Sequence, residues 1–329
     1  MMDTRTKGIA TLQVAIIAAI IVVAGILGAY FLWPRPKTNM IVSTTTSLYE
    51  AGFLDTLKQN FEKKNPGYNI SFISQGTGQA IQTAKNGLAD MILVHDPPSE
   101  LTFLNQSYGV NRKIVAYNFF AIVGPTSDPA MINGTTTLDA FKKIKAAGEN
   151  GTAAFVSRGD NSGTNSKEKR LWQAAGINWT QIRSESWYLE SGQGMTATLN
   201  LANQKNAYTL SDMASYLNNK KNIQLANFIY GGKDLLNVYA AIPCNPQKLP
   251  SAKFEAAMAL TKYMVSDEGQ NLFHNFGVQQ YGDAIFKPWV AVAKTGSPAD
   301  ISQMVQQYAY FQGSECPTQY RSNAGDLYT

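Results

Sequence analysis

The sequence predicts an α/β protein of two lobes joined by a hinge, preceded by one apolar N-terminal helix. Segments typical of strands and of helices alternate along the chain, as they do in parallel α/β folds. About 290 of the 329 residues follow the apolar segment, which is more than one ordinary domain requires. Two long apolar strand segments, 117–125 and 235–244, then fit a chain that crosses into a second lobe and returns.

The N-terminal segment, residues 9–33, carries no charge and is long enough to cross a bilayer as a helix. A short basic leader, residues 1–8, precedes it, and a linker, residues 34–39, follows it. Such leaders usually stay in the cytoplasm. We therefore expect a protein of the cell membrane, anchored by this helix, with its globular part extracytoplasmic.

The string TKGIATLQVAII around Gly8 resembles archaeal class III (pilin-like) signal sequences. The resemblance implies a peptidase cut after Gly8 that leaves the apolar helix on the mature protein. A plain uncleaved anchor fits the sequence equally well, and a conventional secretory signal fits less well because the apolar run is too long.

Composition agrees with an exported protein, since only 16% of the residues are charged. Five N-x-S/T sequons are acceptable glycan acceptors on such a surface: Asn69, Asn105, Asn133, Asn150 and Asn178. In an oxidising compartment the two cysteines, Cys244 and Cys316, could form one disulfide, and the sequence leaves open whether they do.

The net charge of +5 comes from scattered lysines and arginines. Because no basic stripe is interleaved with aromatic residues, nucleic acid is not an expected partner. A mildly positive field favours a small anionic ligand instead.

The first lobe begins with a βαβαβ pattern, which predicts a parallel sheet with right-handed crossovers. The successive segments are a strand and turn (40–47), an amphipathic helix (50–65), a strand (69–74), a glycine turn opening a helix (75–87) and a strand (89–96).

The second lobe is expected to span 121–237, with the first lobe formed by 40–120 and 238–329. Its segments are a strand (152–157), a helix (165–176) and the segment 191–212, which opens with a turn that begins a helix. The helical residues 252–277 are expected to pack back on the first lobe.

The turn SRGDNSGT, residues 157–164, joins a strand to a helix and is the most informative motif in the chain. Backbone N–H groups, the positive helix end, the hydroxyls of Ser162 and Thr164 and the guanidinium of Arg158 gather there. Such a set holds a tetrahedral oxyanion without a metal. The alternative is an ordinary capped helix on a surface loop.

Three further turns, STTTS (43–47), QGTGQ (75–79) and SGQGM (191–195), are also rich in hydrogen-bond donors. In open α/β sheets, ligands bind at the carboxyl ends of the strands, where the first two turns lie. Each turn alone fits a cap or a β-turn. Four of them, two in each predicted lobe, favour an anion enclosed between the lobes.

These turns belong to long strings that resemble tungstate-binding solute receptors of ABC importers. The strings run from STTTSLYEAGFLDTLKQNFEKKNPGYNISFISQGTGQAIQTAKNGLADMILVHDPPSE through SRGDNSGTNSKEKRLW and SGQGM to YTLSDMASYL. The resemblance implies a two-lobe periplasmic-binding-protein-like fold (type II) with a hinge, and an ABC importer permease as partner.

The turns and the resemblance together give one set of candidate ligand-binding residues. Arg158 is the implied counter-charge, and glycines supply backbone N–H groups. The set is Thr44, Thr45, Thr46, Ser47, Thr77, Gly78, Arg158, Ser162, Gly163, Thr164 and Gly194.

Two positions bear on which oxyanion binds. Tungstate, molybdate and sulfate are fully deprotonated near neutral pH and need only donors, whereas phosphate keeps a proton and needs an acceptor. Asp160 resembles the acceptor in phosphate receptors, but we interpret it as a helix-terminal cap paired with Arg158. Met213 stands where the family usually carries arginine, so one cationic element is missing.

No motif for catalysis accompanies these turns. His95 and His274 are the only histidines, and neither lies at a motif spacing from a cysteine, serine or carboxylate. We interpret His95 as a strand-end residue and expect no enzyme activity, no metal site and no cofactor. The alternatives to a tungstate receptor are a molybdate or phosphate receptor of the same fold, or a subunit of a surface filament.

Overall fold

The computed structural model describes residues 21, 23 and 36–328. The predicted leader and, apart from Ile21 and Val23, the predicted apolar helix 9–33 lie outside the described residues. Across the described part of the chain, no helix combines the length and apolar composition that a membrane span requires. The chain from Thr38 onward forms one compact unit.

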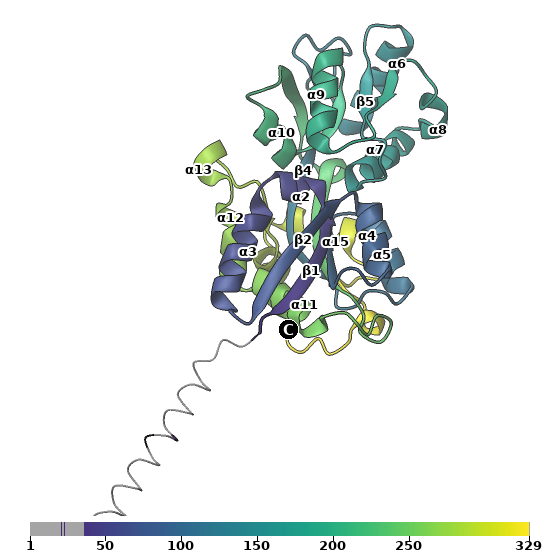
Figure 1. Ribbon diagram of the computed structural model, residues 1–329. Helices are drawn as coiled ribbons and strands as arrows, with labels where there is room; N and C mark the ends of the chain where they lie inside the picture. The colour runs from purple at the N-terminus through teal and green to yellow at the C-terminus, as the bar shows by residue number, and fades with distance from the viewer. Residues whose placement is uncertain (1–20, 22, 24–35, 329) are drawn as a thin grey trace, which may run out of the picture. The chain divides into compact units, whose positions relative to one another are not determined.

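Lobe one, residues 40–120 and 238–329 of the prediction, is built on one mixed sheet (Figure 1). Its first three strands, β1 (Thr38–Thr45), β2 (Tyr68–Gln75) and β3 (Met91–Val94), are parallel, with β1 in the middle. The predicted βαβαβ pattern is therefore confirmed. Beyond β3 the sheet continues antiparallel through β9 (Leu236–Pro243), β4 (Lys113–Pro125) and β10 (Lys287–Pro288).

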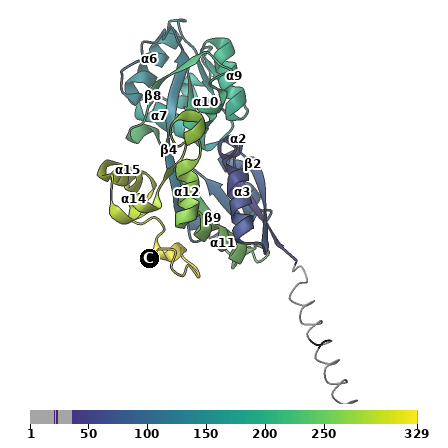
Figure 2. The same cartoon turned by 90° about the vertical axis from the view of Figure 1, so that its left-hand side faces the viewer.

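Helices cover both faces of this sheet (Figures 1 and 2). One face packs against α3 (Phe53–Lys64), α11 (Phe254–Val265) and α12 (Asp267–Asn275). The other face packs against α4 (Thr77–Lys85) and α5 (Pro97–Asn105). The C-terminal part adds α13 (Val278–Tyr281), α14 (Val290–Thr295) and α15 (Ala299–Ala309).

The predicted helix 50–65 is confirmed as α3 but begins three residues later than predicted, and a second, short helix begins within the predicted turn. A short helix, α2 (Thr46–Glu50), directly continues β1, and α3 starts three residues later. Gly52 lies between them with φ of 78°, a left-handed conformation that glycine adopts at little cost. The break turns α2 away from α3 and leaves it at the carboxyl end of β1.

Strand β4 is long enough to belong to both lobes. Its residues 113–119 pair with β9, and residues 120–125 pair with β7 (Thr209–Asp212) and β8 (Leu225–Tyr230) of lobe two. β9 begins immediately after lobe two and runs back into lobe one. The two connections between the lobes are therefore continuous antiparallel strands.

Lobe two contains the remaining elements and has its own core. They are α6 (Thr137–Glu149), β5 (Phe155–Ser157), α7 (Gly163–Ala174), α8 (Trp179–Ile182), β6 (Tyr188–Glu190), α9 (Met195–Lys205) and α10 (Met213–Asn219). Trp172 packs edge-on against Phe141 and Phe155 in this core, while Phe53 packs against Phe273 and Phe286 in lobe one. Each lobe can thus move as a packed unit.

The two cysteines are free thiols in the structure. Cys244 and Cys316 are both buried, and Cys244 donates to the carbonyl oxygen of Ala89 over 3.3 Å. Burial raises the pKa of the Cys244 thiol to about 12. The disulfide considered from the sequence is not formed.

Candidate functional site

The conformation of the lobe-two turn, between β5 and α7, is fixed by the turn's own residues. Gly159 and Asn161 have φ of 62° and 55°, and these left-handed conformations curl the chain back on itself. Ser162 caps α7 by accepting from the backbone N–H of Asn165 over 3.2 Å. The turn is therefore preformed, with its N–H groups gathered at the start of a helix.

Asp160 is paired with Arg158, as the sequence predicts, but it is not the predicted cap of α7, because Ser162 takes that position. Asp160 Oδ1 accepts from the backbone N–H of Ser162 over 3.1 Å, and its Oδ2 pairs with Arg158 Nη2 at 2.5 Å. Arg158 is 3% exposed, so the ion pair fixes a buried guanidinium.

The lobe-one turn, residues 43–47, lies where β1 runs into α2. Thr44 Oγ1 donates to the carbonyl oxygen of Leu93 over 2.9 Å, and the hydroxyls of Thr45 and Ser47 lie 3.2 Å apart. Thr46 Oγ1 accepts from Arg158 Nη2 over 3.1 Å. The contact between Thr46 and Arg158 joins the two turns across the lobes.

The start of α4 lies directly against the lobe-two turn. Gly78 N donates to the carbonyl oxygen of Asn161 over 3.4 Å. A Cβ atom on Gly76 would lie 3.4 Å from the carbonyl oxygen of Asp160, so the two backbones approach closely. The lobes are closed on one another at this point.

Three buried donors between the lobes have no hydrogen-bond partner among the described residues. They are Thr77 Oγ1 from lobe one, and Arg158 Nε and Thr164 Oγ1 from lobe two. Thr77 and Thr164 are each 1% exposed. Because an unpaired buried polar group costs about 1–3 kcal/mol, such atoms in a native protein require an explanation, and an anion accepting from both lobes provides one.

His95 belongs to the same site, although the sequence argument treated it only as a strand-end residue. It is 2% exposed, and its Nε2 lies 3.4 Å from Ser47 Oγ. A Cβ atom on Gly163 would lie 2.7 Å from its Cε1, so the ring fills the space where the lobes meet. Burial lowers the pKa of His95 to about 4, and the imidazole is neutral at pH 7. Its position after β3, a third parallel strand, is the signal that could have placed it here.

Two acidic residues also lie close to the site and were missed. Asp212 is fully buried at the start of α10, and burial raises the pKa of its carboxyl group. Glu50, at the end of α2, accepts from Thr196 Oγ1 over 2.8 Å. Both residues lie in the strings that carry the family resemblance, but neither was given a role in the predicted site.

The predicted residues thus fall into three positions. Thr44 to Ser47, Thr77 and Gly78 lie on lobe one, and Arg158, Ser162, Gly163 and Thr164 lie opposite them on lobe two. Gly194, at the N-terminus of α9, lies against the side chain of Glu50. Met213 is 8% exposed and packs among the apolar residues of lobe two, with no cation at that position.

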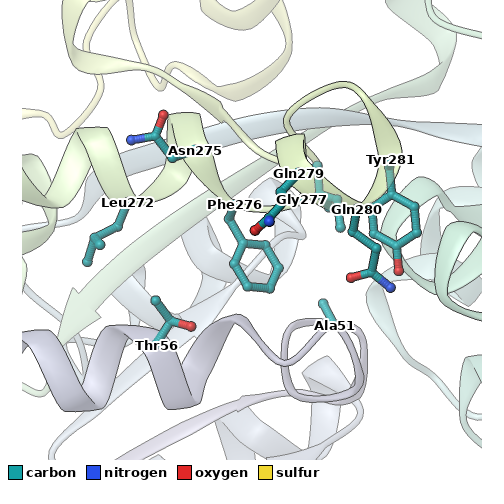
Figure 3. A pocket seen from close by; sticks show the side chains of 10 residues that line it. Ala51, Thr56, Leu272, Asn275, Phe276, Gly277, Gln279, Gln280 and Tyr281 are labelled. Carbon is teal, nitrogen blue, oxygen red and sulfur yellow. The ribbon is translucent and has the colours of Figure 1, made fainter.

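A separate hollow of about 300 Å³ lies in lobe one, between α3 and α13 (Figure 3). Its lining includes Thr56, Leu272, Phe276 and Tyr281 and none of the predicted ligand-binding residues. The lining carries no charged side chain, which does not suit an oxyanion.

Comparisons with known proteins show the family and the fold of this chain. A family model described as a PBP superfamily domain matches residues 34–268. A protein of Haloferax volcanii that carries the name of an ABC transporter anion-binding protein is 45% identical over 256 residues, 76% of this chain and 72% of that protein. The tungstate-binding protein TupA of Peptoclostridium acidaminophilum is 36% identical over 254 residues, 77% of this chain and 87% of that protein.

The chain is also similar to a solved structure of the same family. The tungstate-binding protein TupA from Desulfovibrio alaskensis G20 superposes with a TM-score of 0.65 at 36% identity. The match covers 77% of this chain and 99% of that one. The two-lobe α/β architecture is therefore shared over nearly the whole of the solved relative.

Proposed function

The chain belongs to the PBP superfamily, and from this membership we propose that it captures tungstate outside the cell and delivers it to an ABC importer. Its relatives support a solute-binding role, and two of them are named as tungstate-binding proteins. In this proposal the protein catalyses no reaction. It binds one anion selectively and releases it to the importer.

One observation carries the proposal: three donors without a partner in the described ranges, Thr77 Oγ1, Arg158 Nε and Thr164 Oγ1, come from both lobes and are buried where the lobes meet. An oxyanion that accepts from all three is held only when the lobes are closed. Binding then stabilises the closed state, because only that state offers every contact.

The donor set favours a fully deprotonated anion. The nearest acidic group in the turn, Asp160, already accepts from Arg158 and from the N–H of Ser162. A protonated oxyanion would bring its own donor and meet occupied acceptors there. Tungstate, molybdate and sulfate satisfy the site better on this ground, and the choice of tungstate rests on the named relatives.

Asp212 is the observation that favours a second candidate, hydrogen phosphate. Its carboxyl group is buried and close enough to Arg158 for the guanidinium to lower its pKa, against the larger effect of burial. A carboxylate there could accept the proton that phosphate carries at neutral pH. Phosphate is therefore the competitor that an experiment must include.

Calorimetric titration of the purified full-length chain tests the proposal directly. Tungstate is expected to bind tightly and with one site per chain, with molybdate second and sulfate and phosphate much weaker. Tight phosphate binding without a response to tungstate would overturn the choice of ligand. No binding of any of the four anions would overturn the receptor function.

Membrane attachment through residues 9–33 remains part of the proposal and is tested separately. The full chain is expected in the membrane fraction, and a chain lacking the first 35 residues in the soluble fraction. Assembly of the full chain into filaments under the electron microscope would instead favour the structural alternative.

A further inference from the structure

Helix α9 of lobe two has an N-terminus that its own sequence does not satisfy. Its N-cap is Gly194, which offers no side-chain acceptor, and the first turn of this 11-residue helix carries no acidic residue. The N-terminal N–H groups and the positive end of the helix dipole therefore favour an anion from elsewhere.

Lobe one supplies that anion. Glu50, the last residue of α2, places its carboxylate at this helix end, where Oε2 accepts from Thr196 Oγ1 over 2.8 Å and from Thr196 N over 3.3 Å. A Cβ atom on Gly194 would lie 2.8 Å from Glu50 Oε1, so the absence of a side chain there lets the carboxylate approach. The contact crosses from one lobe to the other.

Three further hydrogen bonds surround this contact. Asn218 Nδ2 of α10 donates to the backbone oxygen of Glu50 over 2.9 Å, and Asn219 Nδ2 donates to Thr196 Oγ1 over 3.2 Å. Tyr281 of α13, which lies across the hollow from Ala51 in Figure 3, donates to Asn218 Oδ1. Lobe one thus holds lobe two through both α2 and α13.

The same short helix also borders the proposed ligand site. Thr46, at the first position of α2, contacts Arg158, while Glu50, at its last position, contacts α9. The helix packs against α9 and α10 (Figures 1 and 2). Closure of the lobes around the ligand and docking of Glu50 on α9 therefore belong to one movement.

We infer that Glu50 is a closure latch: a built-in carboxylate that docks on the N-terminus of α9 and lengthens the time for which the ligand is held. This inference rests on the proposed hinge-closing function. When the lobes open, Glu50 returns to water and α9 loses its anion. The latch stabilises the closed state alone, so it slows dissociation, and removing it is not expected to slow association.

Stopped-flow measurement on the full chain with tungstate tests the latch in three proteins. Glu50→Gln keeps the shape of the side chain and removes its charge, and we expect dissociation about tenfold faster, equivalent to about 1.4 kcal/mol. Glu255→Gln, on the exposed side of α11, is the matched control and should release tungstate as the wild type does. Unchanged dissociation in Glu50→Gln, or an equal loss in association rate, would overturn the inference.

A second variant tests the latch by a change in lobe two. Gly194→Ala keeps an ordinary backbone conformation, since φ is −61°, but displaces the Glu50 carboxylate. It should speed dissociation in the wild-type chain and add nothing in a Glu50→Ala chain. Additive effects of the two changes would contradict the latch.

Small-angle scattering without ligand separates the latch from the proposed function. Glu50→Gln is expected to have a larger radius of gyration than the wild type and Glu255→Gln, because fewer molecules are closed. This difference is expected even if tungstate proves to be the wrong anion. Equal radii in all three ligand-free proteins would overturn the latch while leaving the receptor function in place.

Discussion

The two turns that face each other across the lobes use their polar groups differently. In the lobe-one turn, residues 43–47, the hydroxyls have partners within the protein, including Leu93 O, Gln75 and Arg158. In the lobe-two turn, residues 157–164, Arg158 Nε and Thr164 Oγ1 are buried without a partner in the part of the chain that the structure describes. Both turns are donor-rich in sequence, yet lobe two carries the free donors and the charge. Lobe one mainly supplies a fixed frame, with Thr77 as its free donor.

The largest expected effect follows from the charge on lobe two. Arg158→Ala should weaken tungstate binding at least about 100-fold, or about 2.7 kcal/mol, because it removes the counter-charge and a charge-assisted hydrogen bond. Arg183→Ala is the control, since Arg183 pairs with Glu190 on the exposed surface of lobe two. Calorimetry measures the affinity of both variants for tungstate. If the two variants bound tungstate equally well, the site would be misplaced.

The next effect distinguishes free hydroxyls from occupied ones. Thr164→Val and Thr77→Val should each cost about tenfold or more in affinity, since a hydrogen bond to a charged group contributes about 1.5–3 kcal/mol. Thr44→Val should change affinity less than about threefold and instead lower stability by about 1 kcal/mol, because it removes the hydrogen bond to Leu93 O. If Thr44→Val weakened binding as much as Thr164→Val did, the contrast between the turns would be wrong.

The smallest effect concerns His95, which touches both turns through Ser47 and Gly163. Its pKa is lowered by burial to about 4, so between pH 6.5 and 4 the unfolded chain binds a proton that the folded chain does not. Stability therefore falls as the pH falls through this window, by about 2 kcal/mol at pH 5 from this group.

Urea unfolding at pH 7 and pH 5 measures this loss. His95→Gln should lose less stability than the wild type between the two values, because glutamine does not titrate. Identical losses in the two proteins would show that His95 does not titrate differently on folding.

Much of the fold could be predicted from the sequence because its signals are local. Short strand segments between helical segments marked β1 to β3, and the long apolar segments marked β4 and β9 as the connections between lobes. The break at Gly52 was missed because helical periodicity continues across it, and only the left-handed backbone separates α2 from α3.

The turns that form the site could be predicted from the sequence, but the contacts that other residues make across the lobes could not. Strand-to-helix junctions rich in glycine and hydroxyls pointed to Arg158 and Thr164 without knowledge of contacts. Glu50 and its docking on α9 depend on how two distant helices meet across a hinge, and no local pattern encodes that distance. The assignment of Asp160 to Arg158 succeeded because the two residues are only two positions apart.

A crystal structure of the chain with tungstate, phased on the tungsten anomalous signal, tests the central claim most directly. The account predicts one strong peak between the lobes, within hydrogen-bonding reach of Thr77 Oγ1, Arg158 Nε and Thr164 Oγ1. A peak elsewhere, for example in the hollow between α3 and α13, with those three donors still unpaired, would contradict it.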